Sequence, residues 1–167
     1  MGVFHVVGYS LDSYFVEFPE IKTKSYTINM KVIGKEVDGA RANFIGLESH
    51  LGNVSQDYTI PKFLELGNDK DFVEVRRFRD IVHNLFSAFS PDIIGIYFKP
   101  STGKFPAGPL TYKIEGLIQL YEGKNMQFVD PRSIAALKKK KEYEVTRQFA
   151  YQQKAADVAY YLINNDE

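Results

Sequence analysis

Short apolar segments at the start of the regular part of the chain predict three consecutive strands. The patterns of residues 30–36, 41–49 and 58–66 are typical of strands, and turns separate them. The Asp38-Gly39 dipeptide between the first two segments favours the positive φ angles of a tight hairpin. We therefore expect these segments to pair as an antiparallel meander.

The rest of the chain alternates helices with strands. Apolar residues recur at helical spacing within residues 68–89, and the continuous apolar run 92–98 is typical of a strand buried on both faces of a parallel sheet. The same patterns predict a helix over 110–121, a short helix that starts at residue 131 and a last helix over about 142–163. They also predict a short strand over 124–130. This order predicts an α/β fold with a mixed five-stranded sheet flanked by helices, an order shared by the ribonuclease H-like fold.

Residues 1–29 lie outside this pattern. They are rich in β-branched and aromatic residues, then broken near Pro19, which predicts one or two extra strands. The start of the chain has no basic region and carries Asp12 early, so we do not interpret it as a signal peptide. With 167 residues in total, we expect one domain over 30–167 and an N-terminal extension over 1–29.

The composition narrows the chemistry. The chain has no cysteine, which excludes disulfides, thiol catalysis and cysteine-ligated metals. Its three histidines are far apart in sequence and do not have the spacing of a histidine metal site. Absence of cysteine is typical of proteins in a reducing compartment, so we expect a cytoplasmic location. No apolar run reaches the roughly 18 residues of a membrane span, so we expect no membrane partner.

Positive and negative charges balance. Lys and Arg number 21, as do Asp and Glu, whereas nucleic-acid binders usually carry a basic excess. Basic runs at 76–79 and 138–141 leave a local basic face open, although each is equally typical of a solvated helix or loop.

Three single acids lie where a fold could gather them. Glu36 ends the first expected strand, although an acid there is also typical of an ordinary surface turn. Glu115 borders the apolar stripe of its helix, and Asp157 lies between small apolar neighbours on the last helix. A buried carboxylate needs compensation, which a metal ion would supply. Gly116, beside Glu115, is predicted to allow close packing of that helix on the sheet.

The loop that follows the 92–98 strand suggests a phosphate contact but not a nucleotide site. Its "STGK" segment lacks the P-loop pattern, because Phe98 occupies the position of the first glycine and Phe105 follows Lys104. Lys104, near a helix start, can contact a nucleic-acid phosphate. The other interpretation is a plain connecting loop.

Several of these segments together resemble a known group. The segments "MKVIGKEVDG", "TGKFPAGPLTYKIEGLIQL", "VDPRSIAALKK" and "KAADVAYYLI" are similar to RuvC-like members of the ribonuclease H-like superfamily. The resemblance is strongest to a small bacterial family of uncharacterised RuvC-like proteins with a G-K-F loop and a K-x-E helix. It covers the chain from residue 30 to the end.

The resemblance assigns roles by position. Glu36 matches the first-strand acid, where RuvC-type resolvases have Asp, and Asp157 matches the last-helix acid of a D-A-A-D-A pattern. Lys154 stands at the preceding acid of that pattern, and Tyr97 and Phe98 stand where an acid of the fourth strand is expected. A second register, with Asp12 as the first-strand acid, fits the order of strands less well.

Two functions follow from the resemblance. The first is a nuclease that depends on Mg²⁺ or Mn²⁺ and cleaves DNA or RNA, including branched forms. Its catalytic residues and metal ligands would be Glu36, Glu115 and Asp157, with Glu115 substituting for the missing fourth-strand acid. The residues predicted to contact phosphate are Lys104, Lys138, Lys139 and Lys140. The alternative is a catalytically inactive module that binds nucleic acid, or a protein partner or second copy through residues 1–29.

Overall fold

The computed structural model describes residues 29–102, 106–142 and 148–165. Within these ranges the strands are β1 (Asn29–Asp38), β2 (Arg41–His50), β3 (Asn53–Asp57), β4 (Phe63–Glu65), β5 (Ile93–Tyr97) and β6 (Asn125–Val129). The helices are α1 (Phe72–Phe89), α2 (Pro109–Gln119), α3 (Pro131–Lys140), the 3₁₀ turn η1 (Ala150–Gln152) and α4 (Gln153–Asn164). The extra strands predicted for 1–29 fall outside the described residues, except that Asn29 begins β1.

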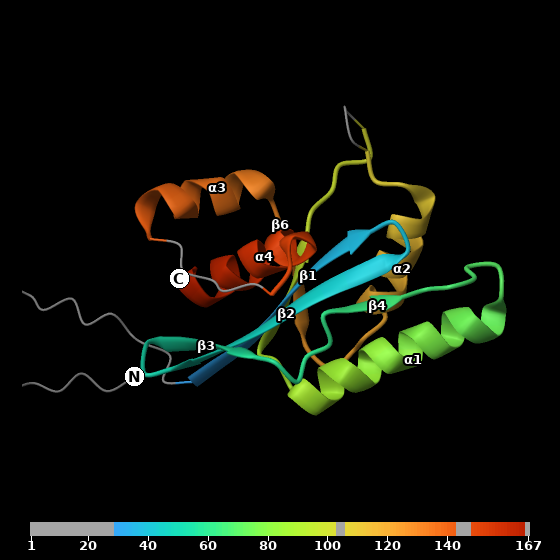
Figure 1. Ribbon diagram of the computed structural model, residues 1–167, viewed down its shortest axis with the longest axis horizontal. Helices are drawn as coiled ribbons and strands as arrows, with labels where there is room; N and C mark the ends of the chain where they lie inside the picture. The colour runs from blue at the N-terminus through green and yellow to red at the C-terminus, as the bar shows by residue number, and fades with distance from the viewer. Residues whose placement is uncertain (1–28, 103–105, 143–147, 166–167) are drawn as a thin grey trace, which may run out of the picture.

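The strands form one mixed sheet, in the order β3-β2-β1-β5-β6, with β4 also pairing with β2 (Figure 1). β2 pairs antiparallel with β1, β3 and β4, whereas β5 is parallel to both β1 and β6. The predicted mixed sheet flanked by helices, with the ribonuclease H-like order, is confirmed. The sheet has one strand more than the five predicted.

The third predicted strand is the main error of the sequence interpretation. Residues 58–66 do not form one strand; pairing with β2 stops after Asp57 and resumes at Phe63. Asp57 Oδ1 accepts a hydrogen bond of 2.7 Å from the amide of Thr59, which turns the chain out of the sheet. Pro61 then has no amide hydrogen to donate, so the segment between the two strands cannot continue the ladder.

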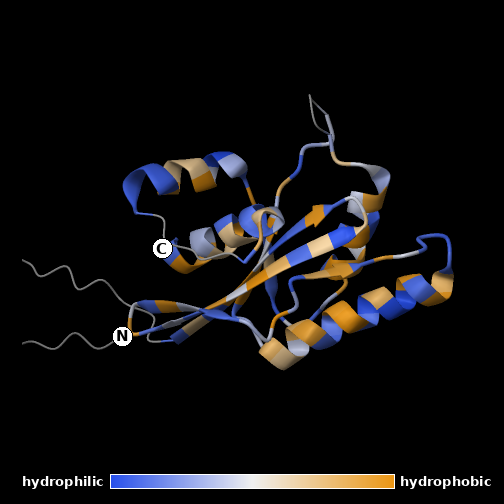
Figure 2. Cartoon of the chain, in the orientation of Figure 1, coloured by the Kyte–Doolittle hydropathy of each residue, from blue (hydrophilic) through white to orange (hydrophobic). Residues whose placement is uncertain are grey.

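Helices cover both faces of the sheet (Figure 1). On one face, α2 packs against β1, and α1 packs against α2 and β4, with a core that includes Ile33, Phe86 and Ile114. On the other face, α4 covers the sheet, with a core that includes Val32 and Val158, and α3 packs on α4. Figure 2 shows α1 as an amphipathic helix with alternating apolar and polar stripes. Neighbouring residues of β1 therefore serve different cores.

α4 approaches the sheet very closely at two glycines. A Cβ atom on Gly34 of β1 would lie 2.1 Å from the Ala155 carbonyl oxygen and 2.8 Å from the Ala159 Cβ. A Cβ on Gly95 of β5 would lie 2.4 Å from Val158 Cγ1. The prediction for Gly116 was wrong, since a Cβ there would meet no heavy atom of the described residues within 4 Å beyond the backbone of its own helix.

The ends of the helices differ from the sequence prediction by a few residues. Asp71, rather than the expected Asn68 or Asp69, caps α1 and accepts a 2.8 Å bond from the Val73 amide. Ser90, in the left-handed region at φ 52°, ends the helix. The last helix was predicted to begin at about residue 142, but residues 142, 148 and 149 are not helical, and helical structure begins at η1 and continues through α4. No helix in the described ranges has the length and hydropathy to cross a membrane.

Candidate functional site

The carboxyl ends of β1 and β5 lie at one edge of the sheet, because the two strands are parallel. Glu36 and Asp38 come from the end of β1, and Tyr97 from the end of β5. The amino-terminal end of α4 brings Lys154 to the same edge, where it contacts Glu36. Ligand sites of open α/β sheets are found at this edge.

Glu36 is a buried carboxylate held by two ammonium groups. Its Oε1 atom lies 3.0 Å from Lys99 Nζ and 2.9 Å from Lys154 Nζ. Its Oε2 atom accepts a bond of 3.3 Å from Asn43 Nδ2, the residue opposite it on β2. Only 3% of Glu36 is exposed. Burial of this charge is thus compensated within the protein.

The two lysines are fixed in different ways. Lys99 also donates to the Val37 carbonyl at 2.5 Å and lies 3.6 Å from Asp38 Oδ1. Burial lowers the pKa of Lys154, but the hydrogen bond and charge of Glu36 outweigh it, so this pKa lies above its ordinary value. The Lys154 ammonium is 5.3 Å from the centre of the Tyr97 ring. The cluster of Glu36, Lys99 and Lys154 therefore has one negative and two positive groups.

Asp157 lies one turn after Lys154 on α4, so it is on the same face of the sheet as Glu36. It is 9% exposed, and its Oδ1 atom accepts bonds of 2.8 Å from Lys138 Nζ and 2.6 Å from Gln153 Nε2. Burial raises the pKa of Tyr97, and the charges of Glu36 and Asp157 raise it further while Lys154 lowers it. Tyr97 therefore senses both carboxylates from the end of β5.

Glu115 lies on the opposite face of the sheet. It projects from α2 toward Lys35 of β1, and successive residues of a strand point to opposite faces, so Lys35 and Glu36 are separated by the sheet. Lys35 is completely buried, and neither its Nζ atom nor Glu115 Oε1 has a hydrogen-bond partner among the described residues. Burial lowers the pKa of Lys35 to about 7, an effect that the charge of Glu115 partly offsets. Burial likewise raises the pKa of Glu115.

The structure does not bring the three predicted acids together. Glu36 and Asp157 share the α4 face of the sheet, whereas Glu115 lies on the face that α2 covers. No group of three or more His, Cys, Asp or Glu side chains in the described part of the chain is placed to hold a metal ion. Both oxygens of Glu36 already accept bonds from nitrogen donors, so these residues as arranged do not fit a shared divalent cation. Their catalytic and metal-binding roles stay predictions.

The predicted phosphate contacts are also dispersed. Lys104 falls outside the described residues. Lys138 pairs with Asp157, while Lys139 and Lys140 are exposed in the last turn of α3. Their contact with phosphate stays a prediction.

A groove opens at the edge where Glu36 is buried. Its volume is about 740 Å³, and its walls come from the β1–β2 hairpin, the segment after β5 and the start of α2. The walls include Lys99, Lys154, Tyr97 and Phe98, and Phe98 is 42% exposed. We name this the lysine groove. Sequence reasoning identified Lys154 only as a departure from an acid and assigned Lys99 no role, since nothing in the linear pattern shows that both reach Glu36.

Comparison with known proteins supports the fold and gives a family. A family model described as a protein of unknown function (DUF3010) matches residues 30–162. No curated protein matches the chain.

Several solved structures are similar in fold to this chain. The structure of Thermus thermophilus RuvC has a TM-score of 0.60 at 9% identity, over 79% of this chain and 92% of that one. T. thermophilus RuvC in complex with a Holliday junction substrate gives 0.58 at 11% identity, over 79% and 91%. The yeast mitochondrial Holliday junction resolvase Ydc2 gives 0.49 at 13% identity, over 84% and 79%. At these identities the likeness to RuvC shows a shared fold.

Proposed function

The chain belongs to the DUF3010 family of proteins of unknown function, and we propose that it is a ribonuclease H-like module that binds nucleic acid without cleaving it. The observation that carries this proposal is the pair of ammonium groups on Glu36 at the end of β1. A nuclease of this fold needs carboxylates there to hold divalent metal ions. Here Lys154 stands at a position where the resemblance expects an acid, and it neutralises the acid that remains.

The lysine groove has the chemistry of a nucleic-acid contact. Half of the Lys154 side chain is exposed, so its ammonium can reach a phosphate while it remains near Glu36. Phe98 and Tyr97 beside it offer flat surfaces to bases or sugars. The T. thermophilus RuvC fold, to which this chain is similar, has been solved with a Holliday junction, which supports DNA as the ligand class.

The test is a binding and cleavage assay on the full chain. Fluorescence anisotropy would measure binding to a four-way junction, a duplex and a single strand at several salt concentrations. Gel analysis of the same substrates with Mg²⁺ or Mn²⁺ would measure cleavage. We expect binding that weakens as salt increases, and intact substrate.

A pair of matched variants locates the contact. Lys154→Gln removes one ammonium while Lys99 and Asn43 still hold Glu36, so we expect a several-fold loss of affinity and a smaller salt dependence. Lys70→Gln is the control, because Lys70 is 87% exposed and precedes α1, the helix on the sheet face opposite α4. This variant should leave binding unchanged. Absence of binding to every substrate, or equal effects of the two variants, would contradict the proposal.

A nuclease dependent on Mg²⁺ or Mn²⁺ is the second candidate. The observation in its favour is that Glu36 and Asp157 share the α4 face in a fold similar to RuvC. Metal-dependent cleavage that disappears in Asp157→Asn would establish it and overturn the non-catalytic proposal. A protein partner bound through residues 1–29 stays a prediction.

A further inference from the structure

A cluster of aromatic rings lies beside the lysine groove, on the α4 face of the sheet. Phe149 and Tyr151 stack with their ring centres 5.3 Å apart and their planes within 8°. Phe63 meets Tyr151 edge-on at 6.0 Å. We name these three rings the aromatic platform. They come from β4 and from the segment that leads into α4.

Two cations flank the aromatic platform. The guanidinium of Arg41 lies 4.6 Å from the centre of the Phe63 ring, and Lys62 Nζ lies 4.4 Å from that of Phe149. Phe149 is 41% exposed and Tyr151 36%, so both rings remain open to solvent. Exposed rings beside positive groups are complementary to a ligand that is flat, aromatic and negatively charged.

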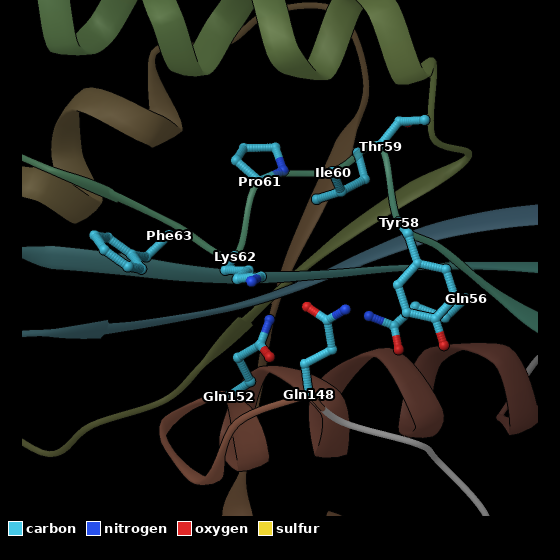
Figure 3. Close-up of a pocket in the computed structure, with 9 residues that line it drawn as sticks. All are labelled: Gln56, Tyr58, Thr59, Ile60, Pro61, Lys62, Phe63, Gln148 and Gln152. Carbon is cyan, nitrogen blue, oxygen red and sulfur yellow. The ribbon is translucent and has the colours of Figure 1, made fainter.

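A small pocket adjoins the platform and is lined in part by polar side chains. Its volume is about 330 Å³, and Lys62, Phe63, Gln56 and Gln148 are among the residues that line it. In Figure 3, Gln148 reaches from the segment before α4 toward the segment between β3 and β4 that carries Lys62, while Gln56 lies beside Tyr58. The Oε1 atom of Gln56 is buried without a hydrogen-bond partner among the described residues. An amino or ring N–H group of a ligand would satisfy it.

The platform lies near the lysine groove. Tyr151 precedes Lys154 by one turn of the same helical segment. Phe63 pairs across the sheet with Asn43, which itself donates to Glu36. These two links bring the rings close to the ammonium of Lys154, so one extended ligand can contact both.

From this arrangement we propose that the aromatic platform stacks unpaired bases of single-stranded nucleic acid. The inference rests on the proposed function and adds its ligand class. Bases within a duplex are already stacked on each other, so only unpaired bases offer a free face to Phe149 and Tyr151. The Gln56 and Gln148 amides are of the type that contacts base edges, and Lys62 and Lys154 supply positive charge for the phosphates.

The experiment compares single-stranded and duplex oligonucleotides of one sequence, with the full chain and its variants. Tyr151→Leu removes a ring but keeps apolar volume, and Tyr151→Phe keeps the ring. Phe72→Leu is the matched control, because Phe72 is 66% exposed and has the Arg76 guanidinium 5.4 Å from its centre, on α1 at the other face. A single strand carrying 2-aminopurine reports stacking directly through quenching of its fluorescence.

We expect Tyr151→Leu to weaken single-strand binding about tenfold and to reduce the quenching, with duplex binding unchanged. Tyr151→Phe and Phe72→Leu should behave as the wild type. If Tyr151→Leu leaves single-strand binding unchanged, or weakens single strand and duplex equally, the platform inference is overturned while nucleic-acid binding stands. If the wild type binds no oligonucleotide of any kind, the proposed function itself fails.

Discussion

Replacing the buried lysine of β1 is expected to change how the stability of the protein depends on pH. Lys35 is fully buried in the core between the sheet and α2, and its ammonium has no hydrogen-bond partner among the described residues. Lys35→Met keeps a side chain of similar length and shape and removes the group that titrates. The variant therefore isolates the effect of one buried amine.

The direction and size of the effect follow from the pKa. In the folded chain the pKa of Lys35 is lowered to about 7, whereas its ordinary value is 10.5. Between these values the unfolded chain binds a proton that the folded chain does not, so the free energy of unfolding rises as pH increases from 7 to 10.5. Each pH unit adds at most about 1.4 kcal/mol to the free energy of unfolding. Because Lys35 of the folded chain is still half protonated at pH 7, the total gain between pH 7 and 9 is about 2 kcal/mol.

Urea unfolding of both proteins at intervals from pH 7 to 9 measures the effect. We expect Lys35→Met to lack this gain, so that the difference in unfolding free energy between variant and wild type changes by about 2 kcal/mol over the range. The variant also changes the surroundings of Glu115 and the packing of the core, which offsets the two curves from each other, so the slope is the quantity to compare. Lys31→Met is the control, because Lys31 is a 45% exposed lysine on the same strand, and its curve should run parallel to the wild type. Parallel curves for Lys35→Met would refute the reasoning.

Further predictions concern the packing of α4 and the charge cluster at the end of β1. Gly34→Ala should destabilise the fold severely, because its Cβ would lie 2.1 Å from a carbonyl oxygen, whereas Gly116→Ala should stabilise it by about 1 kcal/mol through helix propensity. Thermal unfolding compares the two variants, and similar changes in Tm would contradict the close approach of α4. Glu36→Gln should lower the free energy of unfolding by about 3 kcal/mol, because two partly buried ammonium groups lose their carboxylate, and should tighten nucleic-acid binding; a neutral effect in urea titration would count against the ion pairs. Mg²⁺ or Mn²⁺ at millimolar concentration should leave the Tm of the wild type unchanged, and a marked rise would instead indicate a bound metal.

Local patterns predicted most of the fold. Asp38-Gly39 placed the first hairpin correctly, since Gly39 has φ 58° and the two strands pair up to Asp38 and Arg41. The apolar run 92–98 identified a central parallel strand because both faces of β5 are covered by helices. The third strand was placed wrongly because its turn depends on the Asp57 side chain and on Pro61, which interrupt an apolar pattern that otherwise looks continuous.

The candidate site was less accessible to sequence reasoning. Alternation along β1 indicates that Lys35 and Glu36 point in opposite directions, but it does not say which face α2 covers, so the separation of Glu115 from Glu36 could not be foreseen. Lys99 and Lys154 are 55 residues apart in the numbering and meet on one carboxylate only through the fold. The aromatic platform likewise brings together Phe63 and Tyr151, which are far apart in the sequence.

The glycine contacts of α4 also determine how the two proposed binding regions act together. Gly34 and Gly95 seat this helix so tightly that its amino-terminal turn has little room to slide or tilt against the strands. Lys154 lies on that turn and Tyr151 on the η1 turn directly before it, so the spacing between ring and ammonium is set before any ligand binds. A flexible nucleic-acid strand would have to adopt the spacing between Tyr151 and Lys154, and the entropy cost of binding would then come mainly from ordering the nucleic acid.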